Sequence, residues 1–206
     1  MLELDHLVYA VPDLARGIED FATQTGIRPQ MGGRHPERGT HNALVGLSGG
    51  AYLELIAPDP DSSVPPPRWM GVDLLTEPKI TRWCLRTDAL TERAGQLQRT
   101  LPGHGQVRSG RRQTPDGTLL EWTMTLPLPT PEVDVIPFFI DWSSSEAHPA
   151  QGLPGQLELK SLTLSHPEAE RMQQIFSETG LPNEVLTGAA IAIRVRLQTP
   201  AGIVEL

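Results

Sequence analysis

Two ten-residue stretches, LDHLVYAVPD at positions 4–13 and LKSLTLSHPE at positions 159–168, align with each other without a gap. In both stretches apolar residues recur as in a β-strand, and a proline followed by an acidic residue comes next. Each stretch leads into a segment with apolar residues at helical spacing, 14–25 and 169–179, which ends in Thr-Gly. Glycine at that place permits the left-handed backbone that stops a helix. The chain therefore contains an internal repeat, and this repeat decides the fold.

Both copies close in a short strand that contains a glutamate, YLEL at 52–55 and IVEL at 203–206. With the β signals that precede these strands, each copy has the order βαβββ. The middle of the chain is a third, more diverged copy. Its predicted parts are a strand at 80–87, a helix at 89–101, a hairpin of 107–112 and 119–126 around Pro115, Asp116 and Gly117, and a closing strand at 136–142.

We predict an α+β fold in which repeated βαβββ modules form cupped mixed sheets with helices outside. The predicted modules are residues 1–58, 79–143 and 157–206, and the linkers between them are 59–78 and 144–156. An odd number of modules leaves one module without an internal partner, and a homodimer is one way to supply it.

Composition and charge argue against several classes of function. Asp and Glu total 25 against 17 Lys and Arg, which gives a net charge of −8. Such a field repels phosphate backbones, so we expect no nucleic-acid partner. No stretch approaches the roughly 20 apolar residues that span a bilayer, so we expect no membrane partner and a cytoplasmic location. The lone cysteine, Cys84, fits a buried thiol in a reducing compartment. The one basic cluster, Arg108, Arg111 and Arg112, is either a solvated hairpin tip or a local site for an anionic group.

The first copy carries a candidate site on two of its strands. His6 lies in the opening strand and Glu54 in the closing strand, YLELI. Residues two apart in a strand share a face, so the imidazole and the carboxylate converge if those two faces coincide. Imidazole and carboxylate are ligands of Zn²⁺, Fe²⁺, Mn²⁺ and Ni²⁺ at catalytic sites. A lone histidine in a strand is also commonly structural, whereas a glutamate in an apolar strand is costly unless it has a partner.

These motifs resemble a known family. LDHLVYAVPD at 4–13, GTHN at 39–42, YLELIAP at 52–58 and IPFFIDW at 136–142 are similar to the glyoxalase-like proteins of the vicinal oxygen chelate superfamily. The resemblance covers nearly the whole chain. It implies paired βαβββ modules whose cupped sheet surrounds a divalent metal, with one ligand from the first strand and one from the fourth strand of each module.

Carried over by position, the resemblance makes His6 and Glu54 the ligands of the first module and Glu205 a ligand of the last. The middle module offers Arg82 and, approximately, Phe139 at those places. If the first and last modules face each other, His6, Glu54 and Glu205 form a three-ligand site. If the first and middle modules do so, Arg82 stands where a ligand belongs, and an anion site or an ion pair with Glu54 is expected.

Further residues are candidates for contact with a substrate. His41 and Asn42 begin a strand, either as an exposed cap or as contacts to substrate or metal. Trp83, Trp122 and Trp142 lie in predicted strands of the middle module, as core or as the wall of an apolar pocket. The other histidines, His35, His104, His148 and His166, lie beside Gly or Pro or near a strand end, and we expect them at the surface.

The resemblance implies two functions. The first is metal-assisted isomerase, lyase or dioxygenase chemistry on a small oxygenated metabolite, with Zn, Ni, Fe or Mn as the ion and Glu54 or Glu205 as ligand or proton-transfer base. The second is a metal-free protein that binds and sequesters a small molecule in the same cup. Motifs of phosphate-binding loops and dinucleotide-binding folds are absent from the sequence, and the run GLSGG at 46–50 is predicted as a hairpin turn between two strands, not the strand-to-helix turn of a serine hydrolase.

Overall fold

The computed structural model describes residues 2–114, 117–153 and 157–206, so the predicted turn residues Pro115 and Asp116 lie outside the described residues. In chain order, the elements are β1 (Glu3–Ala10), α1 (Leu14–Thr25), β2 (Gln30–His35), β3 (Thr40–Gly46), β4 (Tyr52–Pro58), the 3-10 segment η1 (Trp69–Leu74), β5 (Lys79–Arg86), α2 (Leu90–Thr100), β6 (Val107–Gln113), β7 (Leu119–Thr125), β8 (Phe138–Asp141), β9 (Glu158–His166), α3 (Ala169–Thr179), β10 (Val185–Thr187), β11 (Ala192–Thr199) and β12 (Gly202–Glu205). Three βαβββ units follow one another along the chain.

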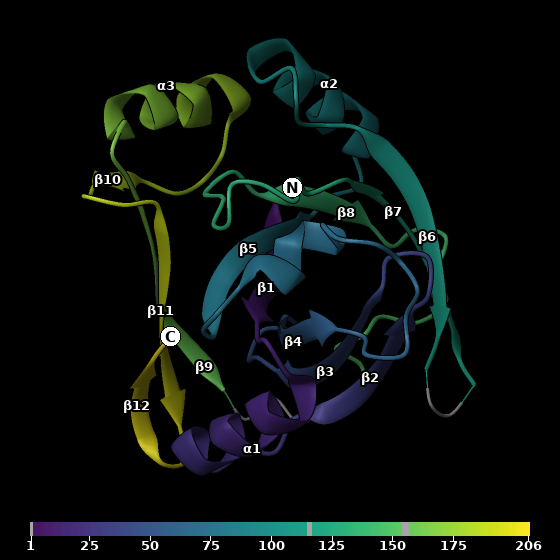
Figure 1. The fold of residues 1–206 in the computed structure, drawn as a ribbon. Helices are drawn as coiled ribbons and strands as arrows, with labels where there is room; N and C mark the ends of the chain where they lie inside the picture. The colour runs from purple at the N-terminus through teal and green to yellow at the C-terminus, as the bar shows by residue number, and fades with distance from the viewer. Residues whose placement is uncertain (1, 115–116, 154–156) are drawn as a thin grey trace.

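The first two units share one curved, eight-stranded sheet with the order β2-β3-β4-β1-β5-β8-β7-β6. Their opening strands β1 and β5 pair antiparallel at its centre, and each closing strand, β4 or β8, pairs parallel with the opening strand of its own unit. Figure 1 shows this sheet wrapped into a cup, with α1 and α2 outside it. The predicted fold class is therefore confirmed, and the modules that face each other are the first and the middle ones.

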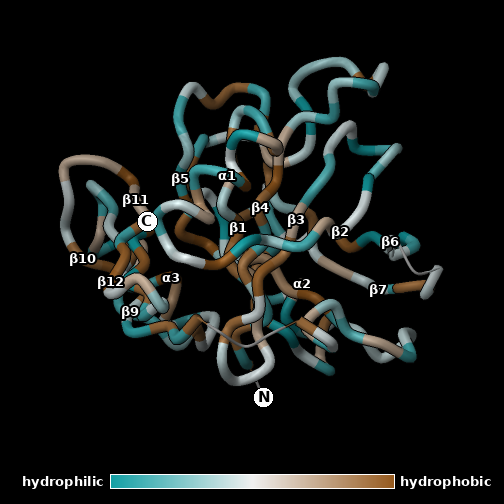
Figure 2. The backbone as a smooth tube through the Cα atoms, turned by 90° about the horizontal axis from the view of Figure 1, so that it is seen from below, coloured by the Kyte–Doolittle hydropathy of each residue, from teal (hydrophilic) through white to brown (hydrophobic). Residues whose placement is uncertain are grey.

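The two edges of the cup approach each other where β2 meets β6. The buried Arg112 of β6 donates a 2.9 Å hydrogen bond from Nη1 to the backbone oxygen of Gly32. A Cβ atom on Gly33 would lie 3.3 Å from that same guanidinium and from the Gln113 carbonyl, so glycine allows the edges to come this close. Strand β6 is otherwise exposed and is hydrophilic in Figure 2, as suits an edge strand that must not pair with another chain.

Strand alternation divides the core of the cup into two clusters. Leu7 and its neighbours on the convex side join a large cluster under the helices, whereas Val8 and Ala10 join a second cluster inside the cup. The helices fit this division, because the apolar residues Leu14, Ile18 and Phe21 of α1 all face the sheet and are buried.

The third unit forms its own four-stranded sheet, with the order β10-β9-β11-β12. The apolar side of this sheet and the inner face of α3 belong to the large cluster on the convex side of the cup. The other side carries charged residues such as Arg194, Arg196 and Glu205, which are exposed. The third module thus finds its packing partner within the chain. Among the described residues, no helix has the length and apolar character needed to span a bilayer.

Candidate active site

His6 and Glu54 meet at the floor of the cup. The register of the central strands pairs His6 with Tyr52 and Val8 with Glu54, so the side chains of His6 and Glu54 enter the same concave face. They line a cavity of about 30 Å³, together with His35, Asn42, Tyr52, Trp69, Arg112, Trp122, Met124, Phe138, Ile140, Trp142 and Pro149. The predicted convergence of imidazole and carboxylate is present in the structure.

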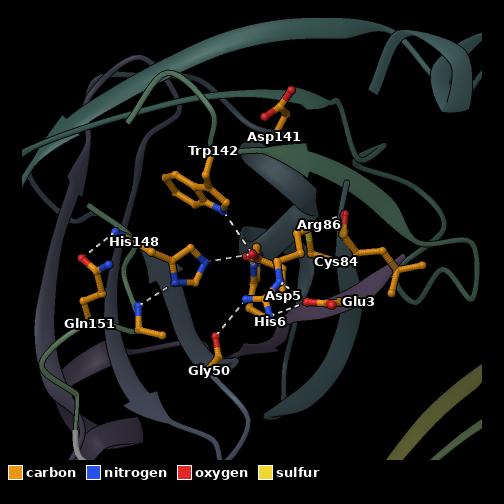
Figure 3. Close-up of polar contacts among 12 residues, drawn as sticks. Glu3, Asp5, His6, Gly50, Cys84, Arg86, Asp141, Trp142, His148 and Gln151 are labelled. Carbon is orange, nitrogen blue, oxygen red and sulfur yellow. Dashed lines mark hydrogen bonds and ion pairs between the residues drawn. The ribbon is translucent and has the colours of Figure 1, made fainter. Parts of the chain in front are cut away.

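A buried carboxylate holds the imidazole of His6 from behind. The Oδ1 atom of Asp5 lies 2.6 Å from Nδ1 of His6, while its Oδ2 atom accepts hydrogen bonds from the indole of Trp142 (3.1 Å) and from Nε2 of His148 (2.9 Å). Figure 3 shows these three side chains directed at Asp5. The pairing of β1 with β5 shifts register between Leu4 and His6, an irregularity of the kind that re-aims side chains near functional sites.

The hydrogen bonds decide the charge of Asp5. Burial alone would raise the pKa of this carboxyl, but the hydrogen bonds from His148 and His6, with the charges of both rings, lower the pKa well below its usual value. Asp5 is therefore ionised, and an ionised carboxylate accepts the Nδ1 proton of His6. This leaves Nε2 as the nitrogen of His6 that faces the cavity.

Glu54 is oriented from the opposite side by Asn42. Nδ2 of Asn42 donates a 2.5 Å hydrogen bond to Oε1 of Glu54, and Oε2 of Glu54 lies 3.8 Å from Nε2 of His6. That separation is too long for a hydrogen bond, and it lets one reacting group contact both side chains. Asn42 needs Gly32 opposite it, because a Cβ there would lie 2.3 Å from Oδ1 of Asn42. This Oδ1 is buried and has no hydrogen-bond partner among the described residues.

Two neutral side chains complete the floor. The ring of Tyr52 stacks on His6 at 4.7 Å, and burial, together with the charges of Asp5 and Glu54, raises the pKa of its hydroxyl well above the usual value. Burial and the same two carboxylates raise the pKa of the Cys84 thiol. Cys84 is therefore a protonated thiol, which is a poor nucleophile.

The middle module places no metal ligand at the corresponding positions, both of which lie in described strands. Arg82 matches His6, but it is buried and its guanidinium donates 2.7–2.8 Å hydrogen bonds to the carbonyl oxygens of Thr81, Leu128, Pro131 and Glu132. It forms no ion pair with Glu54 and anchors the segment between β7 and β8. The counterpart of Glu54 is Phe138, because Cys84 pairs with Phe138 as Val8 pairs with Glu54.

Four other candidates lie away from the floor of the cup. Phe139 and Trp83 belong to the cluster on the convex side, since each lies one residue out of phase with the concave face. His41 is half-buried, beside Asn42 in the strand, and does not line the cavity. Glu205 of β12 is exposed on the separate sheet, where it pairs with Arg196 at 3.0 Å. The structure thus does not bring Glu205 together with His6 and Glu54, whereas Asn42 and Trp122 do line the cavity.

The prediction that the remaining histidines lie at the surface is wrong for His35, which is buried, and the other three, His104, His148 and His166, are half-buried. His35 is buried at the mouth of the cavity, where its ring contacts Trp69 edge-on at 5.2 Å. His148 lies in the segment between the second and third modules, and its ring bonds Asp5. Neither position has a periodic pattern that could reveal it. The sequence does not reveal the role of Asp5 either, because a residue next to His6 in a strand is expected on the opposite face.

The donor set does not fit the complete metal centre that the resemblance implies. Catalytic metal sites use three or more protein ligands, and the described residues offer only His6 and Glu54 at the floor of the cup. The one group of three potential ligands in the described parts of the chain is Asp5, His6 and Cys84, whose donor atoms lie within 4.8 Å of one another. Asp5 already accepts hydrogen bonds from three side chains, which it would have to give up to hold an ion. His6 and Glu54 remain an imidazole and a carboxylate that face each other across the cavity.

Comparison with known proteins agrees with this architecture. The profile of the glyoxalase-like domain matches residues 4–180, so the chain belongs to the glyoxalase-like domain family. This confirms the resemblance seen in the sequence. No curated protein sequence matches significantly.

Solved structures are similar as well. The crystal structure of a hypothetical protein from Staphylococcus aureus is similar over 100% of this chain and 98% of its own, with a TM-score of 0.70 and 15% identity, and it shares the fold. Methylmalonyl-CoA epimerase from Mycobacterium tuberculosis is similar over 67% of this chain and 86% of its own (TM-score 0.43, 22% identity). A variant of the Streptomyces coelicolor methylmalonyl-CoA epimerase, in complex with 2-nitronate-propionyl-CoA, is similar over 70% and 97% (TM-score 0.44, 20% identity).

Proposed function

We propose that this protein is an enzyme that moves a proton within a small oxygenated metabolite, in an isomerase- or lyase-type reaction, with His6 and Glu54 as the acid–base pair. One observation carries the proposal: Nε2 of His6 and Oε2 of Glu54 lie 3.8 Å apart in a buried cavity, each held by its own partner. Paired groups fixed at such a distance are what general acid–base catalysis needs.

The proposed step starts with a substrate whose carbonyl end reaches the floor of the cup. Glu54, as the carboxylate, takes a proton from the carbon next to the carbonyl, while protonated His6 gives the Nε2 proton to the carbonyl oxygen. The electron pair of the broken C–H bond forms the C=C bond of an enol. Asp5 holds the ring in place for this step, because its carboxylate lies 2.6 Å from Nδ1 and leaves Nε2 toward the substrate.

The cycle closes when the protons return. When the carbon that lost its proton carries a hydroxyl group, the intermediate is an enediol. Glu54 then gives its proton to the former carbonyl carbon, and His6 takes the proton of the other oxygen, which yields the isomer with the carbonyl group moved by one carbon. If a leaving group departs from the next carbon instead, the same pair performs an elimination. The buried, protonated Cys84 and Tyr52 take no part in the proton balance.

The test is exchange of carbon-bound hydrogen with solvent. We would incubate the protein in D₂O with a panel of small carbonyl and hydroxy acids and follow deuterium incorporation by NMR. Exchange should occur with at least one member and fall roughly 100-fold or more in Glu54→Gln, the usual scale of general acid–base catalysis. Glu205→Gln is the matched control, because this exposed glutamate holds the equivalent position in the third module. Equal exchange in both variants would contradict the proposal.

Elemental analysis of the same purified protein tests whether the chemistry depends on a metal ion. Protein purified without chelator or affinity-tag metal should lack stoichiometric Zn, Ni, Fe or Mn by elemental analysis. Near-stoichiometric metal that vanishes in Glu54→Gln would replace metal-free proton transfer with metal-assisted chemistry.

A second candidate function is sequestration of a small apolar compound. The observation that favours it is the aromatic wall of the cavity, formed by Trp69, Trp122, Phe138 and Trp142. Tight binding of a compound that undergoes neither exchange nor turnover would establish this function.

A further inference from the structure

A larger groove continues the cavity outward, between the edge strands β2 and β6. The groove measures about 810 Å³ and shares His35, Trp69, Arg112 and Trp122 with the inner cavity. A Cβ atom on Gly110 of β6 would lie 2.6 Å from the ring of Trp122, so glycine at this position leaves room for the indole that lines the groove. A molecule that lies in the groove can therefore extend one end toward His6 and Glu54.

Positive charge collects in this groove, although the chain carries a net charge of −8. The residues that line the groove include two glutamates and four arginines, which are Arg34, Arg38, Arg111 and Arg112. Arg34 is balanced by Asp59 and Asp61, at 3.1 and 2.7 Å. Arg111 lies opposite Glu121 in the strand pair and points to the other face of β6 from Arg112. Among the residues that the structure describes, Arg38 and Arg112 have no carboxylate within ion-pair distance, although the charge of Glu37 acts on Arg38 from farther away. These two guanidinium groups are therefore available to an anion in the groove.

The arginines are positioned by the fold. Arg112 is 9% exposed and spends one nitrogen on Gly32, which fixes its guanidinium at the junction of cavity and groove. Arg38 lies over the ring of Trp69, with its guanidinium carbon 4.7 Å from the ring centroid. Holding unpaired guanidinium groups in partly buried positions is costly unless an anion offsets the cost.

Two further groups indicate the sign of the ligand. Burial, helped by the charges of Arg112, Arg38 and His41, lowers the pKa of His35 to about 3, so this ring stays neutral amid the arginines. The indole nitrogen of Trp69 is buried and has no acceptor among the described residues. A groove with unpaired cations and an unused N–H donor is suited to a ligand rich in acceptor oxygens.

We propose that this groove is an anion subsite, in which Arg38 and Arg112 hold a carboxylate or phosphate group of the substrate while its other end reaches the floor of the cup. The assignment of the bound molecule as substrate rests on the proposed function. Binding of the anion itself does not, because the groove and the acid–base pair use different side chains. Trp69 and Trp122 line the passage between them and suit an apolar part between the two ends of the ligand.

The experiment is an NMR titration of the tryptophan indole N–H signals with inorganic phosphate and, separately, with propionate. The Trp69 signal is identified by its loss in Trp69→Phe. We expect a saturable shift of this signal with at least one probe, and the stronger of the two names the anion class. Arg38→Gln should weaken binding roughly tenfold, the scale of one charge-assisted hydrogen bond. Arg171→Gln, an exposed arginine of α3, should leave binding unchanged.

Two results would overturn the subsite: no saturation with either probe, or equal weakening in the Arg171→Gln control. Because Arg38 is half-buried in the turn between β2 and β3, its substitution leaves the strand pairs in place and guards against a merely structural effect. Glu54→Gln separates the two proposals, since it should abolish proton exchange and retain anion binding. Anion binding without exchange in the wild-type protein would sink the proposed function and keep the subsite.

Discussion

The two halves of the eight-stranded sheet present the same backbone positions with different chemistry. At the first-strand position, one half has His6 and the other Arg82. At the closing-strand position, one half has Glu54 and the other Phe138. The first pair faces a cavity, whereas Arg82 is spent on four backbone carbonyls. The difference teaches that the repeat supplies the cup, while individual side chains decide which half presents ionisable groups to the cavity.

The largest expected effect concerns the structural half of this comparison. Arg82→Leu removes the buried guanidinium that serves four carbonyl oxygens, one in β5 and three in the segment between β7 and β8. Loss of such a charged hydrogen-bond network typically costs about 3–5 kcal/mol. Urea denaturation should show a destabilisation of this size, against a near-neutral Arg171→Gln control. A change below about 1 kcal/mol would mean that Arg82 does not anchor the segment, and the contrast between the halves would fail.

The next effect concerns the support of His6. Asp5→Asn keeps the shape of the side chain but removes the charge that accepts from His6, Trp142 and His148. Hydrogen bonds to a charged group contribute about 1.5–3 kcal/mol, and we expect a loss of that order at pH 7. Proton exchange should fall as well. Because the pKa of Asp5 is lowered in the folded protein, its contribution is present above about pH 4 and lost only in more acid solution. Unchanged stability would show that the carboxylate is not ionised.

A smaller effect tests contact between the halves, since His35 belongs to the first and Arg112 to the second. The unfolded chain protonates this ring near its ordinary pKa of 6.5, whereas the folded protein resists protonation until about pH 3. Stability should therefore be fully present above pH 6.5 and fall by about 1.4 kcal/mol per pH unit below it, or about 2 kcal/mol at pH 5. In His35→Gln, the free energy of unfolding, measured by denaturation at each pH, should lack this part of its dependence on pH. The same dependence on pH in both proteins would contradict a buried, neutral His35.

The smallest effect compares two glutamates that the repeat aligns. The side chain of Glu54 is 7% exposed and that of Glu205 is 70% exposed. Glu205→Gln should change stability by less than about 0.5 kcal/mol, because an exposed ion pair contributes little. A loss of exchange activity in Glu205→Gln would place the third module in the site after all.

The repeat explains why the fold was readable from the sequence. Strand alternation, Thr-Gly helix ends and the two YLEL-like strands indicated the βαβββ order, and His6 and Glu54 followed from it. The predicted closing-strand residue, Phe139, is one position away from Phe138, which lines the cavity. An error of one position in a strand assigns a side chain to the wrong face. The roles of Asp5, His35 and His148 depend on contacts between distant segments, such as Asp5 with His148, which leave no periodic mark. The pairing of the modules likewise depends on which apolar faces pack together.

The central claim is that Asp5 fixes the proton of His6 on Nδ1 and leaves Nε2 to face Glu54. The most direct test is long-range ¹H–¹⁵N NMR of the histidine rings, with His6 assigned by its absence in His6→Gln. The structure predicts that the neutral ring of His6 is the Nδ1–H tautomer and that Asp5→Asn disturbs it. A neutral ring protonated on Nε2 would contradict the account, because no lone pair would then be available to the cavity.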